Sequence, residues 1–137
     1  MTRPPARRPS ILACVLLAVT LSGAQARECC DPESPFREGE GYADTPATCE
    51  TAARWIDEAP DEDERISFVI TGEVVSIDWD GALAYLVMCP EDGVQVMCVT
   101  YSKEGREVGE TVLFAGGYSR VGERRIMLDP CLADPAE

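Results

Sequence analysis

The chain has 137 residues, with 25 acidic side chains, 12 basic side chains and no histidine, so its formal net charge is −13. A field of this sign repels nucleic acid and anionic lipid, and it disfavours both as partners. Without histidine there is no Ser-His or Cys-His nucleophile pair, and no Gly-x-Ser-x-Gly motif occurs. The composition therefore favours a protein that is not an enzyme and has no cofactor.

Residues 1–26 have the features of a secretion signal. Arg3, Arg7 and Arg8 precede an apolar segment, Ile11 to Leu21, and Ala24-Gln25-Ala26 matches an A-x-A cleavage site. The apolar segment is shorter than the roughly 20 residues that span a bilayer. Cleavage would remove three bases and no acids, leaving 111 residues, the size of one small domain, with a net charge of −16. We therefore expect a secreted or periplasmic protein with no membrane span after signal cleavage.

Six of the seven cysteines lie outside this segment, and they predict disulfides. An even number of cysteines in a short exported chain is typical of a disulfide-stabilised domain. The absence of histidine and of any C-x-x-C pair argues against a metal site. The six are Cys29, Cys30, Cys49, Cys89, Cys98 and Cys131.

The part of the chain before the first long apolar run predicts a loop and one short helix. Residues 27–44 contain Pro32, Pro35, Gly39 and Gly41, have no apolar periodicity, and indicate an irregular segment. Thr45-Pro46 is typical of a helix N-terminus, and apolar residues at positions 49, 52, 53 and 56 predict one face of a helix ending near Glu58. The acidic run at 57–64 lacks the ligand spacing and glycine of a calcium loop, so we interpret it as a solvated connector.

The stretch from Ile66 to Asp78 predicts a long strand. It is rich in β-branched and aromatic residues, and its one glycine, Gly72, indicates a bulge or sharp bend in mid-strand. A long, bent first strand can pair along both of its edges, as a small barrel requires. It is thus the first element of a predicted barrel whose core covers 66–131.

Four further strands are expected after the long one. Residues 82–89 and 94–101 predict two strands joined by a hairpin at Pro90 to Gly93. Residues 110–116 predict the fourth strand, 117–122 a loop, and 123–128 a fifth strand that ends at Asp129-Pro130. The tail, 133–137, is expected to be frayed. The prediction for 45–137 is an all-β, disulfide-tied, five-stranded barrel preceded by a short N-terminal helix.

This order of elements resembles the OB-fold, a five-stranded Greek-key barrel. The segments Val69 to Ser76 and Val108 to Gly116 carry the resemblance, the second through a Gly-Glu-x-Val step into the fourth strand. A narrower resemblance, to netrin-like modules and tissue inhibitors of metalloproteinases, is carried by Cys29-Cys30, by Phe68 to Ser76, by Gly109 to Gly116 and by Cys131. Two departures stand out. Those families space their first cysteines as Cys-x-Cys, and cleavage here would leave Arg27, not a zinc-chelating cysteine, at the N-terminus.

The netrin-like resemblance also implies a disulfide pattern. It suggests that Cys29 and Cys30 bond to Cys98 and Cys131, in either order, which leaves Cys49 for Cys89. Adjacent cysteines rarely bond to each other. Hairpin geometry puts the Cα atoms of Cys89 and Cys98 about 8–9 Å apart, beyond the roughly 7 Å limit for a disulfide. Cys98 bonded to Cys131 is the open alternative, because the third and fifth strands of an OB-fold are neighbours.

The OB-fold resemblance implies a binding surface on strands two and three and on the loops between strands one and two and between four and five. Aromatic and arginine side chains in these loops could hold a carbohydrate, a small anion or an acidic segment. Alternatively, the tryptophan caps the barrel and the arginines neutralise nearby acids. We expect a non-catalytic module that binds a protein or small ligand, or else a netrin-like protease inhibitor or envelope-stress protein. The candidate residues are Asp78, Trp79, Asp80, Tyr118, Arg120, Arg124 and Arg125.

Overall fold

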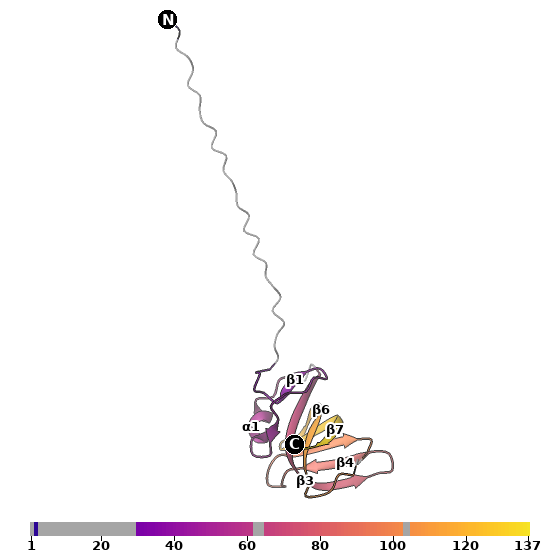
Figure 1. Ribbon diagram of the computed structural model, residues 1–137. Coiled ribbons are helices and arrows are strands. Elements are labelled where there is room, and N and C mark those ends of the chain that lie inside the picture. Colours follow the sequence, from indigo (N-terminus) through magenta and orange to yellow (C-terminus); the bar gives the residue numbers. More distant parts are fainter. Residues whose placement is uncertain (1, 3–29, 62–64, 103–104) are drawn as a thin grey trace.

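The structure is a computed structural model that describes Thr2 and residues 30–61, 65–102 and 105–137 (Figure 1). Apart from Thr2, the predicted signal peptide lies outside the described residues, as does Cys29. No helix in the described part of the chain is long and apolar enough to cross a membrane. The described elements are β1 (Phe36–Glu38), β2 (Ala47–Thr48), α1 (Ala52–Asp57), β3 (Ile66–Trp79), β4 (Ala84–Met88), β5 (Gln95–Thr100), β6 (Thr111–Gly122) and β7 (Arg125–Pro135).

Five strands close into a barrel. Their order is β3-β4-β5-β7-β6, and β6 pairs again with β3. The β5–β7 pair is parallel and the other four pairs are antiparallel. Residues 67–73 of β3 pair with β6, and residues 74–79 pair with β4, so one long strand serves two neighbours. This confirms the all-β fold class and the role predicted for the long strand.

The irregularity in β3 lies slightly beyond its glycine. The register against β4 shifts between Val74 and Ser76, whereas the bulge or bend was predicted at Gly72 itself. Gly72 has a different role, because a Cβ atom there would lie 2.6 Å from the Sγ atom of Cys49 and 3.0 Å from the Sδ atom of Met88. The absence of a side chain at Gly72 therefore makes room for the disulfide that crosses the strand.

The segment predicted to be irregular contains a short strand. In β1, Phe36 pairs with Phe68 of β3. The Phe36 side chain is 1% exposed, and its ring centroid lies 4.8 Å from that of Phe68 and 5.1 Å from that of Tyr118. A three-residue strand is too short to show a period of two, so the sequence pattern did not reveal it. This segment, predicted over residues 27–44 and called the lead segment below, thus contributes one aromatic side chain to the core.

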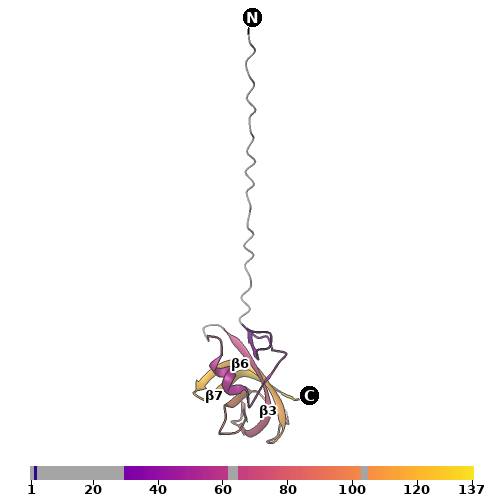
Figure 2. The same ribbon diagram turned by 90° about the vertical axis from the view of Figure 1, so that its left-hand side faces the viewer.

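The helix is shorter than predicted. Ala47 and Thr48, expected to be helical, instead form β2 and pair in parallel with β3. The Thr48 N–H donates to the Thr51 hydroxyl at 2.9 Å, and α1 begins only at Ala52. Pairing with the free edge of β3 satisfies backbone groups that another helical turn would have used. The buried residues of α1, Ala52 and Ile56, pack it against the barrel (Figure 2).

The last two strands are longer than predicted. Residues 117–122 are part of β6, not a loop, and β7 continues through Asp129-Pro130 to Pro135. Gly116 pairs with Cys131 and Tyr118 with Leu128, so one residue of β6 lies opposite two residues of β7 between these pairs. A Cβ atom on Gly117 would lie 2.7 Å from the Asp129 carbonyl oxygen. The glycines therefore allow the close approach of two backbones, and the expected frayed tail is largely strand.

Two disulfides link described cysteines. Cys49–Cys89, with a Cα–Cα distance of 5.4 Å, is the predicted pair and holds the helical segment against the barrel. Cys98–Cys131, at 5.3 Å, is the alternative pair, so the predicted bonds from these two cysteines to Cys29 and Cys30 are wrong. The reason is that β5 and β7 are direct neighbours. Cys30 is also disulfide-bonded. These bonds are consistent with an oxidising compartment.

Candidate binding face

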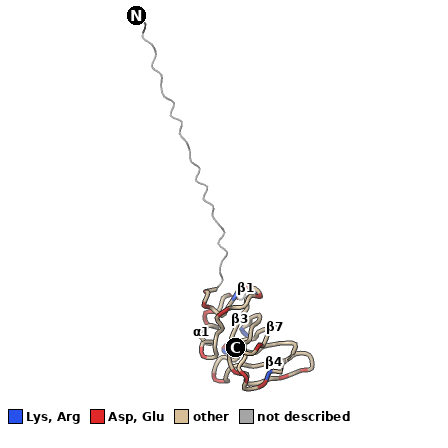
Figure 3. Tube along the Cα trace, viewed as in Figure 1, with Lys and Arg blue, Asp and Glu red and all other residues tan. Residues whose placement is uncertain are grey.

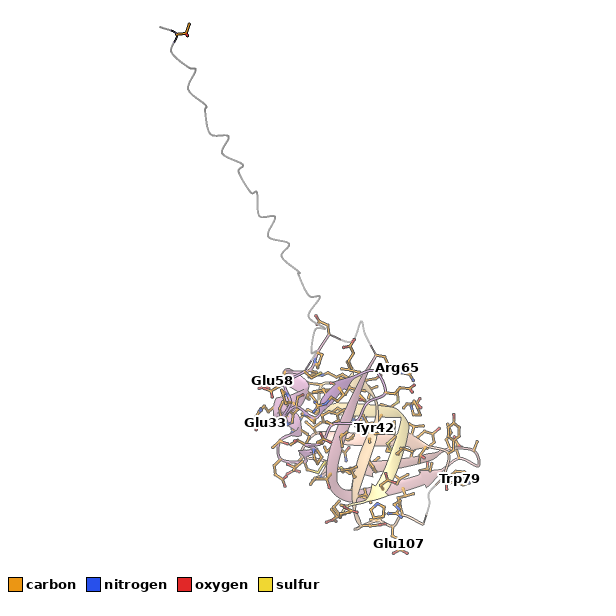
Figure 4. All side chains as sticks on the ribbon, turned by 45° about the horizontal axis from the view of Figure 1, so that its top comes forward. Glu33, Tyr42, Glu58, Arg65, Trp79 and Glu107 are labelled. Carbon is orange, nitrogen blue, oxygen red and sulfur yellow. A yellow bond between two sulfur atoms is a disulfide. The ribbon has the colours of Figure 1, made fainter. Side chains whose placement is uncertain are left out.

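The structure separates the predicted site residues into two groups. At one end of the barrel, Trp79 pairs with Ala84, which pairs with Thr100. At the other end, Arg125 pairs with Gln95. Gln95 and Thr100 are the first and last residues of β5, about 17 Å apart at the usual rise of a strand. Figure 4 likewise shows Trp79 and Glu58, which caps α1, on opposite sides of the domain.

At the first end, Asp80 holds the turn between β3 and β4. Its Oδ1 atom accepts hydrogen bonds from the backbone N–H groups of Ala82 at 2.8 Å and Leu83 at 2.7 Å, and its Oδ2 atom accepts one from the Tyr85 hydroxyl at 2.9 Å. These three hydrogen bonds lower the pKa of Asp80. The bond from Leu83 has the largest effect, followed by those from Ala82 and Tyr85. The same carboxylate raises the pKa of Tyr85. Asp80 is thus occupied in shaping the turn.

This turn gives a pH prediction. Because the folded pKa of Asp80 lies below its unfolded value, its stabilising effect is complete above the unfolded pKa and is lost as the pH falls through the folded one. Tyr85→Phe removes one of the bonds that lower this pKa, so the midpoint of Asp80 should move upward. Carboxyl NMR titration measures the midpoint directly. Tyr101→Phe is the matched control, and an equal midpoint in both variants would contradict the assignment.

At the second end, two of the predicted arginines bind backbone carbonyls. Arg120 donates to the carbonyl oxygen of Glu123 at 2.9 Å and to that of Ile56 at 3.5 Å, which joins the β6–β7 turn to α1. Arg124 donates to the carbonyl oxygen of Asp92 in the β4–β5 hairpin. Both side chains therefore hold the local structure together.

The remaining predicted residues have different surroundings. Tyr118 is 6% exposed and packs in the core, 5.8 Å from the ring of Phe68. Trp79 is 43% exposed beside Ala84, at the open end of the barrel, and Asp78 accepts a hydrogen bond from the Trp79 N–H at 3.0 Å. Arg125 is exposed on β7. Trp79 and Arg125 thus each keep an exposed side chain that a ligand could cover.

The outer surface of three adjacent strands connects the two ends. Alternate residues of a strand point to opposite faces, and here Leu86, Val96, Cys98, Ile126 and Leu128 are the buried set. The residues between them point outward and form what we call the β4–β5–β7 face. Its members are Tyr85, Val87, Gln95, Met97, Arg125, Met127 and Asp129, whereas Val99, which also alternates with this set, is buried.

An apolar row crosses the middle of this face. Val87 pairs with Met97, and Met97 pairs with Met127, so their side chains stand side by side, each partly exposed. Arg125 lies on one side of the row and Asp129 on the other, and both are exposed. The face is therefore apolar in the middle, basic at one end and acidic at the other.

Sequence reasoning missed this row, although a signal was present. Val96 and Cys98 alternate with Gln95, Met97 and Val99, but all except Gln95 are apolar, so the inward and outward sides of β5 look alike. The same holds for Met127 between Ile126 and Leu128. Only the register of the neighbouring strands shows which residues face outward.

Comparison with known proteins does not assign the chain to a family. No protein-family model matches the chain, and no curated protein matches its sequence. The disulfide pattern also departs from the one that the netrin-like resemblance implied. What remains of that resemblance is the closed barrel and its strand order.

Proposed function

We propose that this protein is an exported, non-catalytic binding module of OB-fold type that recognises a protein or small ligand on its β4–β5–β7 face. The observation that carries the proposal is the row of Val87, Met97 and Met127, which the described part of the chain leaves partly exposed. Export is supported by the predicted signal peptide and by the two disulfides.

The arrangement of the face suits binding. Methionine side chains are flexible and polarizable, so they adapt to partners of different shape. Covering the apolar row removes hydrocarbon from water and supplies affinity. Arg125 and Asp129, at opposite ends, fix the orientation of a partner that carries the opposite charges. The β3–β4 and β6–β7 turns border the face at its two ends, which is compatible with a role for both predicted loops in the proposed site.

The test replaces two members of the row. In Met97→Gln with Met127→Gln, side-chain length is nearly kept while the apolar surface is lost, so binding should weaken about tenfold or more. Wild-type and variant proteins would be immobilised and incubated with the secreted or periplasmic fraction of the source cells. Retained protein is then quantified by mass spectrometry, and retained small molecules after organic extraction.

The matched control places glutamine at exposed apolar positions away from the face, Ala53→Gln with Val108→Gln. This control should bind like the wild type, and thermal unfolding should show all three proteins folded. Equal retention by the Met97/Met127 variant would exclude the face. A wild-type protein that retains nothing beyond the blank matrix would refute a binding function.

A further inference from the structure

A groove of about 340 Å³ lies where β5 ends against the second half of β7. Three of the six large apolar side chains that are exposed in the described residues line it: Tyr42 at 52%, Tyr101 at 78% and Leu132 at 49%. Exposed apolar side chains gathered in one place mark interaction sites, whereas scattered ones do not. We call this site the tyrosine groove; Thr100, Ser102 and Pro130 also line it.

The groove continues past Tyr42. A second hollow of about 210 Å³ is lined by Tyr42 and Pro130 as well, and also by Glu40 and Arg65. Tyr42 lies in the lead segment, and Arg65 directly precedes β3; both are labelled in Figure 4. Because Tyr42 and Pro130 line both hollows, the two hollows adjoin each other. A ligand that occupies both of them would be an extended chain and not a compact small molecule.

The charges of the described residues around the groove favour a cationic ligand. Its lining residues carry no charge, and the neighbouring Asp44, Asp129 and Asp134 are exposed. The Arg65 guanidinium in the second hollow is paired with Glu40 at 3.1 Å. Acidic residues also predominate over the rest of the described domain (Figure 3). A basic segment is therefore attracted to this surface and an acidic one is repelled.

Tyrosine rings supply a second reason for a cation. A guanidinium or ammonium group binds over the face of an aromatic ring. The same domain contains an example, since the Arg54 guanidinium carbon lies 4.2 Å from the centroid of the Trp55 ring. Tyr101, at 78% exposure, offers its ring to a ligand in the same way. Pro130 and Leu132 beside it provide apolar contacts.

We propose that the tyrosine groove binds an extended, lysine- or arginine-containing segment of a partner protein. Its cation lies over the ring of Tyr101, and its apolar or proline side chains pack against Tyr42, Pro130 and Leu132. This inference deepens the proposed function, on which it rests, by naming the chemistry of the partner. The groove adjoins the β4–β5–β7 face, because Tyr101 follows β5 and Pro130 follows Asp129 along β7.

The experiment uses peptides of defined charge. A blocked octapeptide of alternating arginine and proline is titrated into the ¹⁵N-labelled protein. Saturable shifts are expected at the amides of Tyr42, Tyr101 and Leu132. The same peptide with glutamine in place of arginine should bind several-fold more weakly, and the glutamate version should not bind. Tyr42→Ala with Tyr101→Ala should weaken the arginine peptide about tenfold, whereas Tyr101→Phe should retain it.

Other outcomes would overturn the inference. They are unchanged affinity in the double alanine variant, shifts that do not saturate, and shifts at these amides from a neutral oligosaccharide such as maltohexaose but not from the arginine peptide. The Met97/Met127 variant separates this inference from the proposed function. If it loses its partner while no basic peptide enters the groove, the binding face stands and the groove assignment fails. If the wild-type protein captures no partner but binds the basic peptide in the groove, the groove assignment stands and the proposed binding face fails.

Discussion

Gly116→Ala should destabilise the domain by about 3 kcal/mol, near the upper end for overpacked sites. A Cβ atom at this position would overlap the carbonyl oxygen of Pro130 and lie 3.0 Å from the Cα atom of Cys131. Both neighbours are backbone atoms of β7, and Cys131 is held in addition by its disulfide to Cys98. The strand therefore cannot move aside cheaply. Urea denaturation at neutral pH measures the loss.

Gly41→Ala is the matched control. There, the nearest atoms to an added Cβ are the Cβ of Arg37 at 3.7 Å and the carbonyl oxygen of Glu38 at 3.8 Å, which are ordinary contacts. The control should therefore be neutral, or stabilising by up to about 1 kcal/mol through the lower entropy of the unfolded chain. Equal stability of the two variants would show that β6 and β7 do not approach each other at Gly116 as described.

The barrel itself could be predicted because its main strands carry local signals. The stretch from Ile66 to Trp79 is long and β-branched, and the turn at Pro90 to Gly93 joins two further apolar runs. Strand length and turn residues act within a few positions of one another, so one sequence is enough to show them. The same local rules gave the wrong answer from Gly117 onward, where residues 117–122 were expected to form a loop, because a glycine pair is also typical of a loop.

The features that sequence reasoning missed depend on contacts between distant segments. The choice between the two pairings left open for Cys98 and Cys131 was decided by the parallel pairing of β5 with β7, a fact about topology and not about cysteine spacing. The β3–β4 and β6–β7 turns lie at opposite ends of the barrel, which the strand register shows. The outward direction of Met97 and Met127 follows only from the strand register. The OB-fold resemblance pointed to the second and third strands, but the residues of the proposed binding face follow only from the structure.

Phe36→Ala should have the largest effect on stability, about 4 kcal/mol, because it removes a fully buried ring. Phe36 lies 4.8 Å from Phe68 and 5.1 Å from Tyr118, measured between ring centroids, in a core that includes no other part of β1. Loss of this ring leaves a cavity between Phe68 and Tyr118 and weakens the pairing of β1 with β3. Urea denaturation with intact disulfides measures the change.

Two further variants make this result specific. Phe36→Leu keeps part of the apolar volume and should cost less than half as much, so the comparison remains possible if the alanine variant does not fold. Tyr42→Ala truncates the other aromatic side chain of the lead segment, which is 52% exposed and should cost less than about 1 kcal/mol. Hydrogen exchange adds a local measurement, because the Val69 N–H donates to the carbonyl oxygen of Pro35 at 3.1 Å. That amide should lose protection in Phe36→Ala and keep it in Tyr42→Ala. Equal protection and equal stability in the two variants would mean that the lead segment merely lies on the barrel, and that the Phe36 ring is not part of its core.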